Sequence, residues 1–262
     1  MFNSLLLYRS LIFQSVYREL QIKYSNSLLG FFWLIAQPLS NILIYIFVFS
    51  EIMKNKFSDN FGYYSYSIYI CIGVICWNLF SESIIKMQSI FLENSNIFKK
   101  INIPKFIFFI NVNIVSIINF IIIFAIFSFF LIFIDKIYNI ILLINFTFVL
   151  LVQITLANGI GFISSVLTVF YKDTLHFTHF ILQIMFWATP IVYPFNILPD
   201  SISKILIYNP LFHIFDSYHD IFVYQKSPKI NDLYYTIAIA IILNIIGLVL
   251  YKTCKADLLD EL

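Results

Sequence analysis

Long apolar stretches, each bounded by short polar segments, occupy most of the chain. A helix of about 20 residues crosses the hydrocarbon core of a bilayer, and six of these stretches reach or approach that length. Because the polar segments between them are short, we expect one all-α integral membrane domain over residues 1–262. The six predicted transmembrane helices are residues 31–50, 66–85, 106–134, 140–170, 176–193 and 233–251.

The N-terminal residues predict a helix that lies on the membrane rather than crossing it. Apolar residues recur every three or four positions through residues 1–25, and polar residues such as Arg18 follow the opposite face. This pattern is typical of an amphipathic interface helix. Both arginines of the chain, Arg9 and Arg18, lie here together with Lys23, which favours the cytoplasmic side for this helix.

A second polar segment, residues 86–105, separates the second and third predicted spans. It carries four lysines against one acidic residue, Glu93, and is the strongest positive-inside signal in the sequence. Apolar residues recur within it at helical spacing, so we expect a helix held against the cytoplasmic face. Its lysines are Lys86, Lys99, Lys100 and Lys105.

The segment between the fifth and sixth predicted spans, residues 195–230, is neither a span nor a simple polar loop. Its apolar runs are too short to cross a bilayer and are interrupted by prolines. Irregular backbone is tolerated at membrane depth where protein covers it or where it lines a water-filled path. We therefore expect two short re-entrant helices on the extracytoplasmic side; an amphipathic loop on the outer surface is the alternative. The residues assigned to this segment and to the turn that leads into it are Pro190, Pro194, Pro199, Asn209 and Pro210.

Local signals place the two short helices. Asn209 followed by Pro210 is a good N-cap and first-turn pair. An apolar stripe follows this pair, opposite polar residues, and predicts an amphipathic helix there. A second short helix is expected before it, over residues 200–208.

The charge distribution predicts the orientation. Six spans put both termini on the same side of the membrane. With that parity, ten of the sixteen Lys and Arg residues fall on the side of the termini, which favours a cytoplasmic N-terminus and a cytoplasmic C-terminus. These ten are Arg9, Arg18, Lys23, Lys86, Lys99, Lys100, Lys105, Lys172, Lys252 and Lys255.

Small residues recur at four-residue spacing in the fourth predicted span. Ala157, Gly161 and Ser165 fall on one face of that helix. Small residues at such spacing allow another helix to approach closely. We therefore expect a tight helix contact along this face.

Motifs for catalysis and metal binding are missing. The chain contains no GxxxxGK[ST], HExxH or GxSxG sequence, so we expect no ATP hydrolysis and no hydrolytic site in this chain. His176 and His179 share a helix face, but no third ligand is near, so no metal is expected. Only Glu82 approaches mid-membrane depth, which weakens the case for ion coupling.

A series of short motifs resembles the transmembrane permease of ATP-binding-cassette polysaccharide exporters. The resemblance runs in order from about Arg18 to Tyr251 and is nearest to permeases that export lipid-linked O-antigen, with capsule and teichoic-acid exporters as close relatives. The motifs are residues 29–33 with 37–38, residues 47–50, 96–104, 171–173 and 189–194, residues 198–199 and residues 209–211.

The resemblance implies an assembly. It implies a homodimer of six-span subunits in the bacterial inner membrane, two separate ATPase subunits that bind ATP and magnesium, and export of an undecaprenyl-linked glycan. The chain itself is expected to bind no cofactor and no nucleic acid, and to contact membrane lipids. The N-terminal helix and the loop after span two, residues 86–105, are implied to contact the ATPases and to gate the cytoplasmic entrance, as a coupling or gate loop. The candidate coupling residues are Arg18, Glu19, Lys23, Glu93, Lys99 and Lys100.

One position departs from the family pattern. Lys172 precedes Asp173 where the family usually has Arg-Asp. Lysine keeps the charge but lacks the planar fork of a guanidinium. We therefore expect a salt-bridged cytoplasmic turn rather than a phosphate clamp.

Aromatic residues within the spans are candidates for the channel lining, because flat rings can pass sugars without strong discrimination. Anchoring at the membrane interface or helix packing is the alternative for each. An ion-coupled secondary flippase and a membrane scaffold without transport remain the other functional hypotheses. The candidate lining residues are Trp33, Tyr45, Trp77, Phe80, Trp187 and Tyr193.

Overall fold

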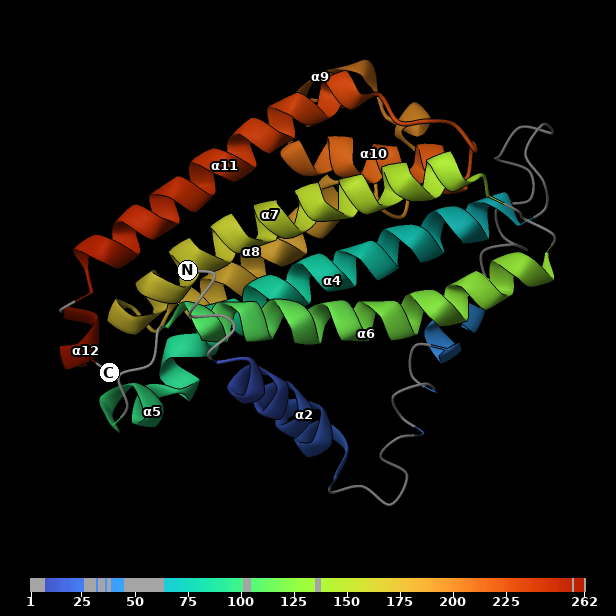
Figure 1. Ribbon diagram of the computed structural model, residues 1–262. Coiled ribbons are helices and arrows are strands. Elements are labelled where there is room, and N and C mark those ends of the chain that lie inside the picture. The colour runs from blue at the N-terminus through green and yellow to red at the C-terminus, as the bar shows by residue number, and fades with distance from the viewer. Residues whose placement is uncertain are drawn as a thin grey trace.

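The regular structure of the chain is helical wherever it is described. The computed structural model describes residues 8–25, 32, 36, 39–44, 64–100, 105–134, 138–255 and 257–261. The long helices run side by side as a bundle (Figure 1). The prediction of an all-α protein is confirmed.

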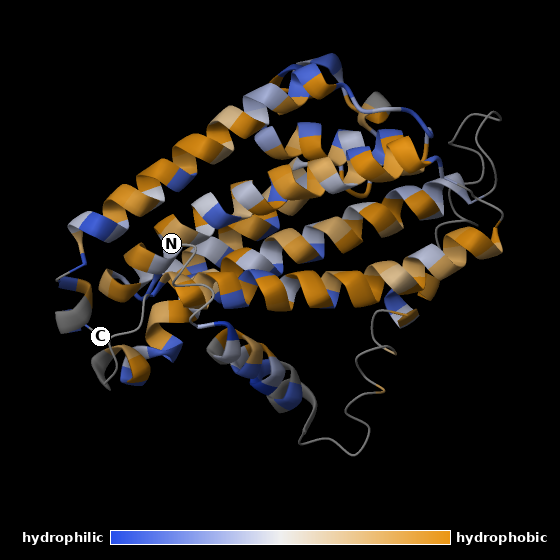
Figure 2. Ribbon diagram, viewed as in Figure 1, coloured by the Kyte–Doolittle hydropathy of each residue, from blue (hydrophilic) through white to orange (hydrophobic). Residues whose placement is uncertain are grey.

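Four helices are long and apolar enough to span a membrane among the described residues. They have 24 to 31 residues, more than the roughly 20 that a crossing requires, and apolar residues cover most of their length (Figure 2). They match the second, third, fourth and sixth predicted spans, so the chain is a multi-pass membrane protein. These helices are α4 (Ser65–Glu93), α6 (Phe106–Phe133), α7 (Ile140–Phe170) and α11 (Ile230–Thr253).

The first predicted span falls largely outside the described residues. Only scattered positions of residues 31–50 are described; residues 39–44 among them are helical. Ile42 belongs to the main apolar core together with residues of α4 and α7. The count of six spans therefore stays a prediction.

The fifth predicted span is shorter in the structure than residues 176–193. Helix α8 (Thr174–Ala188) has 15 residues, which gives about 22 Å at about 1.5 Å per residue, short of the roughly 30 Å hydrocarbon core. The predicted end at Tyr193 was wrong because Thr189 precedes Pro190, and a residue before proline is driven out of the helical region. Thr189 is accordingly extended, with φ −115° and ψ 137°.

Short helices connect α8 to α11. The predicted cap is confirmed: the Asn209 side chain accepts a hydrogen bond from the Leu211 backbone N–H at 3.0 Å, and Pro210 occupies the first turn. The predicted helix over residues 200–208 is also present, slightly shorter. The connecting helices are η1 (Phe195–Ile197), α9 (Asp200–Leu206) and α10 (Pro210–Phe222).

Helix α10 lies inside the bundle, whereas α9 lies on its surface. Helix α10 packs against α4, α7 and α11, and Ile214, Phe215 and Tyr218 are completely buried. In contrast, Ile205 of α9 is 72% exposed. Helix α10 therefore folds back into the protein. The prediction that this segment re-enters the membrane remains a prediction.

The central pair of the bundle is α4 and α7. Helix α4 contacts α6, α7, α8 and α10. Within its most apolar 18-residue stretch, 72% of the residues are buried. The predicted small-residue face of α7 meets α4 at Gly161, where an added Cβ atom would lie 2.8 Å from Met87 Cβ. Ala157 and Ser165 are buried on the same face. The prediction of a tight contact is confirmed.

Helix α7 also approaches α11 closely, so a larger residue at this contact should destabilise the protein. A Cβ atom at Gly159 would lie 2.7 Å from Leu243 Cβ and 3.0 Å from the Asn244 backbone nitrogen. We expect Gly159→Ala to lower the free energy of unfolding by about 1 to 3 kcal/mol, the usual range for overpacking. Thermal unfolding of the detergent-purified protein measures this loss. Ala238→Val adds methyl groups at an exposed position of α11 and should leave the midpoint unchanged.

The polar segment 86–105 is mostly helical. Helix α4 continues through it to Glu93, and α5 (Ser95–Lys100) follows. At the same end of the bundle lies α12 (Asp257–Glu261) (Figure 1). Leu258 of α12 is completely buried against a second apolar cluster formed by α4, α5, α6 and α7. The predicted cytoplasmic loop, residues 86–105, is thus mostly helix and packs together with α12. The last turns of α4, helix α5, Lys105 and α12 are called the coupling platform below.

Candidate functional site

The N-terminal helix α2 (Arg9–Ser25) packs against α6. Val16 is buried, in agreement with the predicted apolar face, and Arg18 is exposed. Phe13 and Tyr17 are more than 60% exposed. Because large apolar groups also occupy the outer face, α2 is less cleanly amphipathic than predicted.

A charged network joins α2 to the bundle. The Lys86 ammonium lies 2.9 Å from a Glu19 carboxylate oxygen and 3.1 Å from a Glu82 carboxylate oxygen. The Asn119 side-chain amide of α6 donates to the same Glu82 oxygen at 2.7 Å. These four residues, the latch cluster below, connect α2, α4 and α6. Partly buried pairs of this kind are screened less by salt than surface pairs.

The latch cluster bears on two predictions. The Glu19 carboxylate, a predicted ATPase contact, is paired with Lys86 inside the chain, and its contact with an ATPase stays a prediction. Glu82, the acidic residue nearest mid-membrane, is paired with Lys86 and Asn119. A carboxylate held in this way is poorly suited to bind and release a coupling ion, which weighs against the ion-coupled alternative.

The structure describes the side chains of only some of the other predicted coupling residues. Glu93 is exposed at the end of α4, at the coupling platform. Lys99 and Lys100 belong to α5 and Lys23 to α2, but their side chains are outside the described part of the chain. Arg18 is exposed on α2, next to Glu19, which contacts Lys86 at the start of the polar segment 86–105.

Lys105, at the start of α6, adds an unusual cation to the coupling platform. Its ammonium lies 5.4 Å from the ring centre of Phe98 and 5.7 Å from that of Phe91. Burial lowers the pKa of Lys105, and the neighbouring charge of Lys255 adds to this effect. The aromatic faces partly compensate for the lost hydration of the ammonium.

The turn between α7 and α8 differs from the predicted salt-bridged turn. Lys172 and Asp173 are both exposed, and no ion pair joins these two described residues. The turn is held by backbone hydrogen bonds instead: Leu175 N–H donates to the Lys172 carbonyl at 3.1 Å, and Phe177 N–H to the Asp173 carbonyl at 3.0 Å. Two exposed charges thus lie at the same end of the bundle as the coupling platform (Figure 1).

Two of the predicted channel residues are packing residues in this subunit. Trp77 is 7% exposed and Phe80 is 1% exposed. The Trp77 ring meets the rings of Phe186 on α8 and Phe215 on α10, with centres 5.5 and 6.2 Å apart. Helix packing, the alternative, holds for both, because α4 is enclosed by its neighbours. Trp33 and Tyr45 lie outside the described residues.

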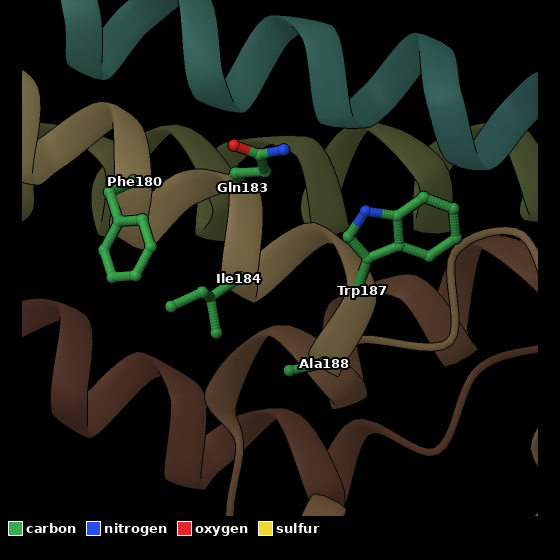
Figure 3. A pocket seen from close by; sticks show the side chains of 5 residues that line it. All are labelled: Phe180, Gln183, Ile184, Trp187 and Ala188. Carbon is green, nitrogen blue, oxygen red and sulfur yellow. The ribbon is translucent and has the colours of Figure 1, made fainter.

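Trp187 lies on an exposed apolar face of α8. Its side chain is 61% exposed and lines a shallow groove of about 570 Å³ with Phe180, Gln183, Ile184 and Ala188 (Figure 3). Phe180 and Ile184 are 59% and 42% exposed. Tyr193, which is half-buried, donates a hydrogen bond to the Trp187 carbonyl at 2.7 Å. The five side chains that line this groove form what we call the α8 face.

The irregular segment after α8 is held by tyrosines of α4. The Tyr66 hydroxyl donates to the Val192 carbonyl at 2.9 Å, and the Tyr69 hydroxyl lies 3.0 Å from the Pro190 carbonyl oxygen and 2.9 Å from that of Tyr193. Carbonyls outside regular structure need such partners when they are buried. Pro194 is half-buried and Pro199 exposed. Sequence reasoning missed both tyrosines, although their spacing on one helix face was visible.

A buried polar network fixes α10 against α4 and α7. The Gln153 side chain, completely buried, donates to the Cys76 carbonyl at 2.6 Å and accepts from the Tyr218 hydroxyl at 2.5 Å. Each group of the network is therefore satisfied within the protein. A lone glutamine inside an apolar stretch was the signal that could have revealed it.

Removing one member of this hydrogen-bond network should destabilise the protein. We expect Gln153→Leu to lower the free energy of unfolding by about 1 to 3 kcal/mol, because it leaves the Tyr218 hydroxyl without its acceptor. The double variant Gln153→Leu/Tyr218→Phe should lose less than the sum of the single losses, as coupled residues do. Thermal unfolding in detergent measures all three. Tyr171→Phe, at an exposed tyrosine, is the control that should have no effect.

An apolar groove of about 610 Å³ opens between α7, α8, α11 and the segment that joins α9 to α10. Leu156, Ile160, Leu167, Phe177 and Met185 contribute to its walls. Its few polar atoms leave it suited to hydrocarbon chains such as those of membrane lipids.

Comparison with known proteins places the chain among transporters. The sequence profile described as ABC-2 type transporter matches residues 10–223. The chain is 26% identical over 240 residues to the O-antigen export system permease protein RfbA of Klebsiella pneumoniae, which covers 91% of this chain and 89% of that protein. It is 25% identical over 244 residues to RfbA of Myxococcus xanthus, with 90% and 89% covered.

A more distant relative is named for a different polysaccharide. The polysialic acid transport protein KpsM of Escherichia coli is 19% identical over 244 residues, with 93% of each chain covered. The profile match includes α2, the long helices α4, α6 and α7, and the α10 segment. The chain therefore belongs to the ABC-2 type transporter family, which confirms the resemblance to permeases of ATP-binding-cassette polysaccharide exporters.

Proposed function

We propose that this chain is the permease subunit of an ATP-driven exporter that moves a lipid-linked polysaccharide, O-antigen in the first instance, across the bacterial inner membrane. The observation that carries the proposal is the similarity over about nine tenths of the chain to permeases named for O-antigen export. Export of a capsular polysaccharide is the second candidate, favoured by the similarity to KpsM. A teichoic acid is a third substrate of the same class.

The proposal assigns ATP hydrolysis to separate subunits. Two ATPase subunits that bind ATP and magnesium would dock at the coupling platform, and this chain would bind no cofactor. The exposed charges of Glu93, Lys172 and Asp173 at that end support this assignment. The same end is proposed to be cytoplasmic, with both termini inside, in accord with the lysine-rich segment 86–105.

The proposal also pairs two copies of the chain. Helix α8 is too short to cross the membrane as a regular helix, and the α8 face is apolar and exposed. A second copy of this chain would cover it, so that two subunits enclose the passage for an undecaprenyl-linked glycan. Trp187 and Tyr193 remain lining candidates under this arrangement.

Deletion of the chain from its producing cell tests the function. Lipid-linked glycan should accumulate on the cytoplasmic side and surface glycan should disappear, and a plasmid copy should restore it. Normal surface glycan in the deletant would refute export by this chain. Composition analysis of the retained glycan separates O-antigen from capsule and teichoic acid.

The energy source needs its own test. A companion ATPase with its catalytic glutamate replaced should reproduce the deletion phenotype. Continued export with that inactive ATPase would favour the ion-coupled secondary flippase. Purification of this chain without any nucleotide-hydrolysing partner would favour the scaffold.

A further inference from the structure

A polar pocket of about 290 Å³ is lined in part by the start of α4, which lies at the end of the bundle opposite α5 and α12 (Figure 1). Its walls come from three parts of the chain that are distant in sequence: the start of α4, the segment from α8 to η1, and the second half of α10 with the residues after it. The side chains that give it its chemistry are Tyr69, Asp216, His219, Asp220, Tyr224 and Lys226.

His219 contributes an unsatisfied polar group to this pocket. The residue is 2% exposed, and its ring stacks on the Tyr69 ring with centres 3.5 Å apart and planes inclined by 14°. The Nε2 atom is buried without a hydrogen-bond partner among the residues that the structure describes. Buried polar atoms are nearly always paired, and an unpaired one costs about 1 to 3 kcal/mol. A ligand in the pocket would supply the missing partner.

Two carboxylates accompany the imidazole. Asp216 and Asp220 are one turn apart on α10 and both line the pocket. The ion pairs found within the described part of the chain involve neither of them. Since both side chains line the pocket, their oxygens can accept hydrogen bonds from a ligand there. Only one cation, Lys226, is among the described residues of the lining.

The combination of groups selects the ligand chemistry. An anion would be repelled by the two carboxylates, and no three His, Cys, Asp or Glu side chains in the described part of the chain are placed so that they could hold a metal ion. Carboxylates and an imidazole suit the hydroxyl groups of a sugar, and the neighbouring aromatic rings suit its C–H face. The volume is near the lower end for small-ligand pockets, which suits a short piece of glycan.

We propose that Asp216, His219 and Asp220 form a sugar-binding subsite at the outer end of the permease. It holds a neutral or amino sugar by hydrogen bonds to its hydroxyl groups, with Tyr69 and Phe195 as apolar walls. This inference rests on the proposed function, and it adds a site at which a residue of the exported glycan is recognised near its exit.

Saturation-transfer NMR tests the subsite on the complete exporter in lipid nanodiscs. The probes are the methyl glycosides of glucose, galactose and mannose, and glucosamine, each at millimolar concentration. We expect transfer from the wild-type protein to at least one probe, and at least tenfold weaker transfer for Asp216→Asn/Asp220→Asn. Both substitutions keep side-chain shape, and ATPase activity of the complex confirms assembly. Asp200→Asn, at an exposed position of α9, is the matched control and should bind like wild type.

The outcomes separate this inference from the export function. Absence of transfer to every probe, or transfer undiminished in the double variant, would overturn the subsite and leave export untouched. Sugar binding that is lost in the double variant supports the subsite even if the deletant shows normal surface glycan. His219→Phe keeps the stacking on Tyr69 and removes Nε2, so weaker binding by this variant separates hydrogen bonding from ring packing.

Discussion

Replacing Lys86 with methionine should reduce export at least tenfold while the subunit still folds and assembles. Methionine keeps the length of the side chain but removes the charge that joins Glu19 of α2 to Glu82 of α4. Two partly buried carboxylates would then lie near each other without a cation, which favours release of α2 from the bundle. If α2 transmits the motion of an ATPase, its release uncouples hydrolysis from transport. Surface glycan and ATPase activity, measured in the same cells and complexes, report the two quantities.

Controls separate the latch cluster from a general effect of charge. Lys86→Arg keeps the charge and should retain most export. Lys252→Met removes an exposed lysine at the end of α11 and should be silent. Glu19→Gln/Lys86→Met should be no worse than Lys86→Met alone, because the two residues act through one contact. Normal export by a stable Lys86→Met protein would show that this contact has no role in coupling.

Cysteine at the α8 face should convert most of the protein to a covalent dimer under mild oxidation. Ile184 and Trp187 are 42% and 61% exposed in the single subunit, and the proposed homodimer brings this face against its copy. We expect Ile184→Cys or Trp187→Cys to give a reducible band of twice the subunit mass in membranes, and the cross-linked form to export poorly. A disulfide needs two Cβ atoms about 3.5 to 4.5 Å apart. Two copies of the same residue come that close only near the two-fold axis of the dimer, so cross-linking is favoured there.

The chain offers good controls for this experiment. Native Cys71 and Cys76 are completely buried and should not react, and Cys254 can be replaced by serine. Ile242→Cys places a thiol on the exposed side of α11, where Ile242 is 54% exposed, away from the α8 face. Equal cross-linking at Ile242 would indicate random collision. Absence of a dimer band from both α8 variants would contradict the proposed pairing.

Local sequence signals located the helices well. The predicted span 140–170 coincides with α7, and the Asn209-Pro210 cap marks the start of α10. Apolar length, capping and small-residue spacing are properties of consecutive residues, so they survive whatever the rest of the chain does. The family was likewise visible in short motifs whose order was preserved.

Side-chain roles were predicted less well. Trp77 and Phe80 were candidates for a channel wall and proved to be buried, because α4 is surrounded by four other helices. The pairing of Glu19 with Lys86, which lies 67 residues further along the chain, was not visible in the sequence either. A helical period shows which residues share a face, but it does not show what that face meets.

The sequence alone determined that this is an all-helical membrane protein with apolar spans, a polar lysine-rich end and a proline-interrupted segment before its last helix, because hydropathy and capping act locally. Only the tertiary structure decided which helix is enclosed, that α8 stops short of a full crossing, and which polar groups meet in the latch cluster and in the pocket beside His219. Those groups are up to about 160 residues apart in the chain, and their pairing depends on how the helices pack, which no local pattern encodes.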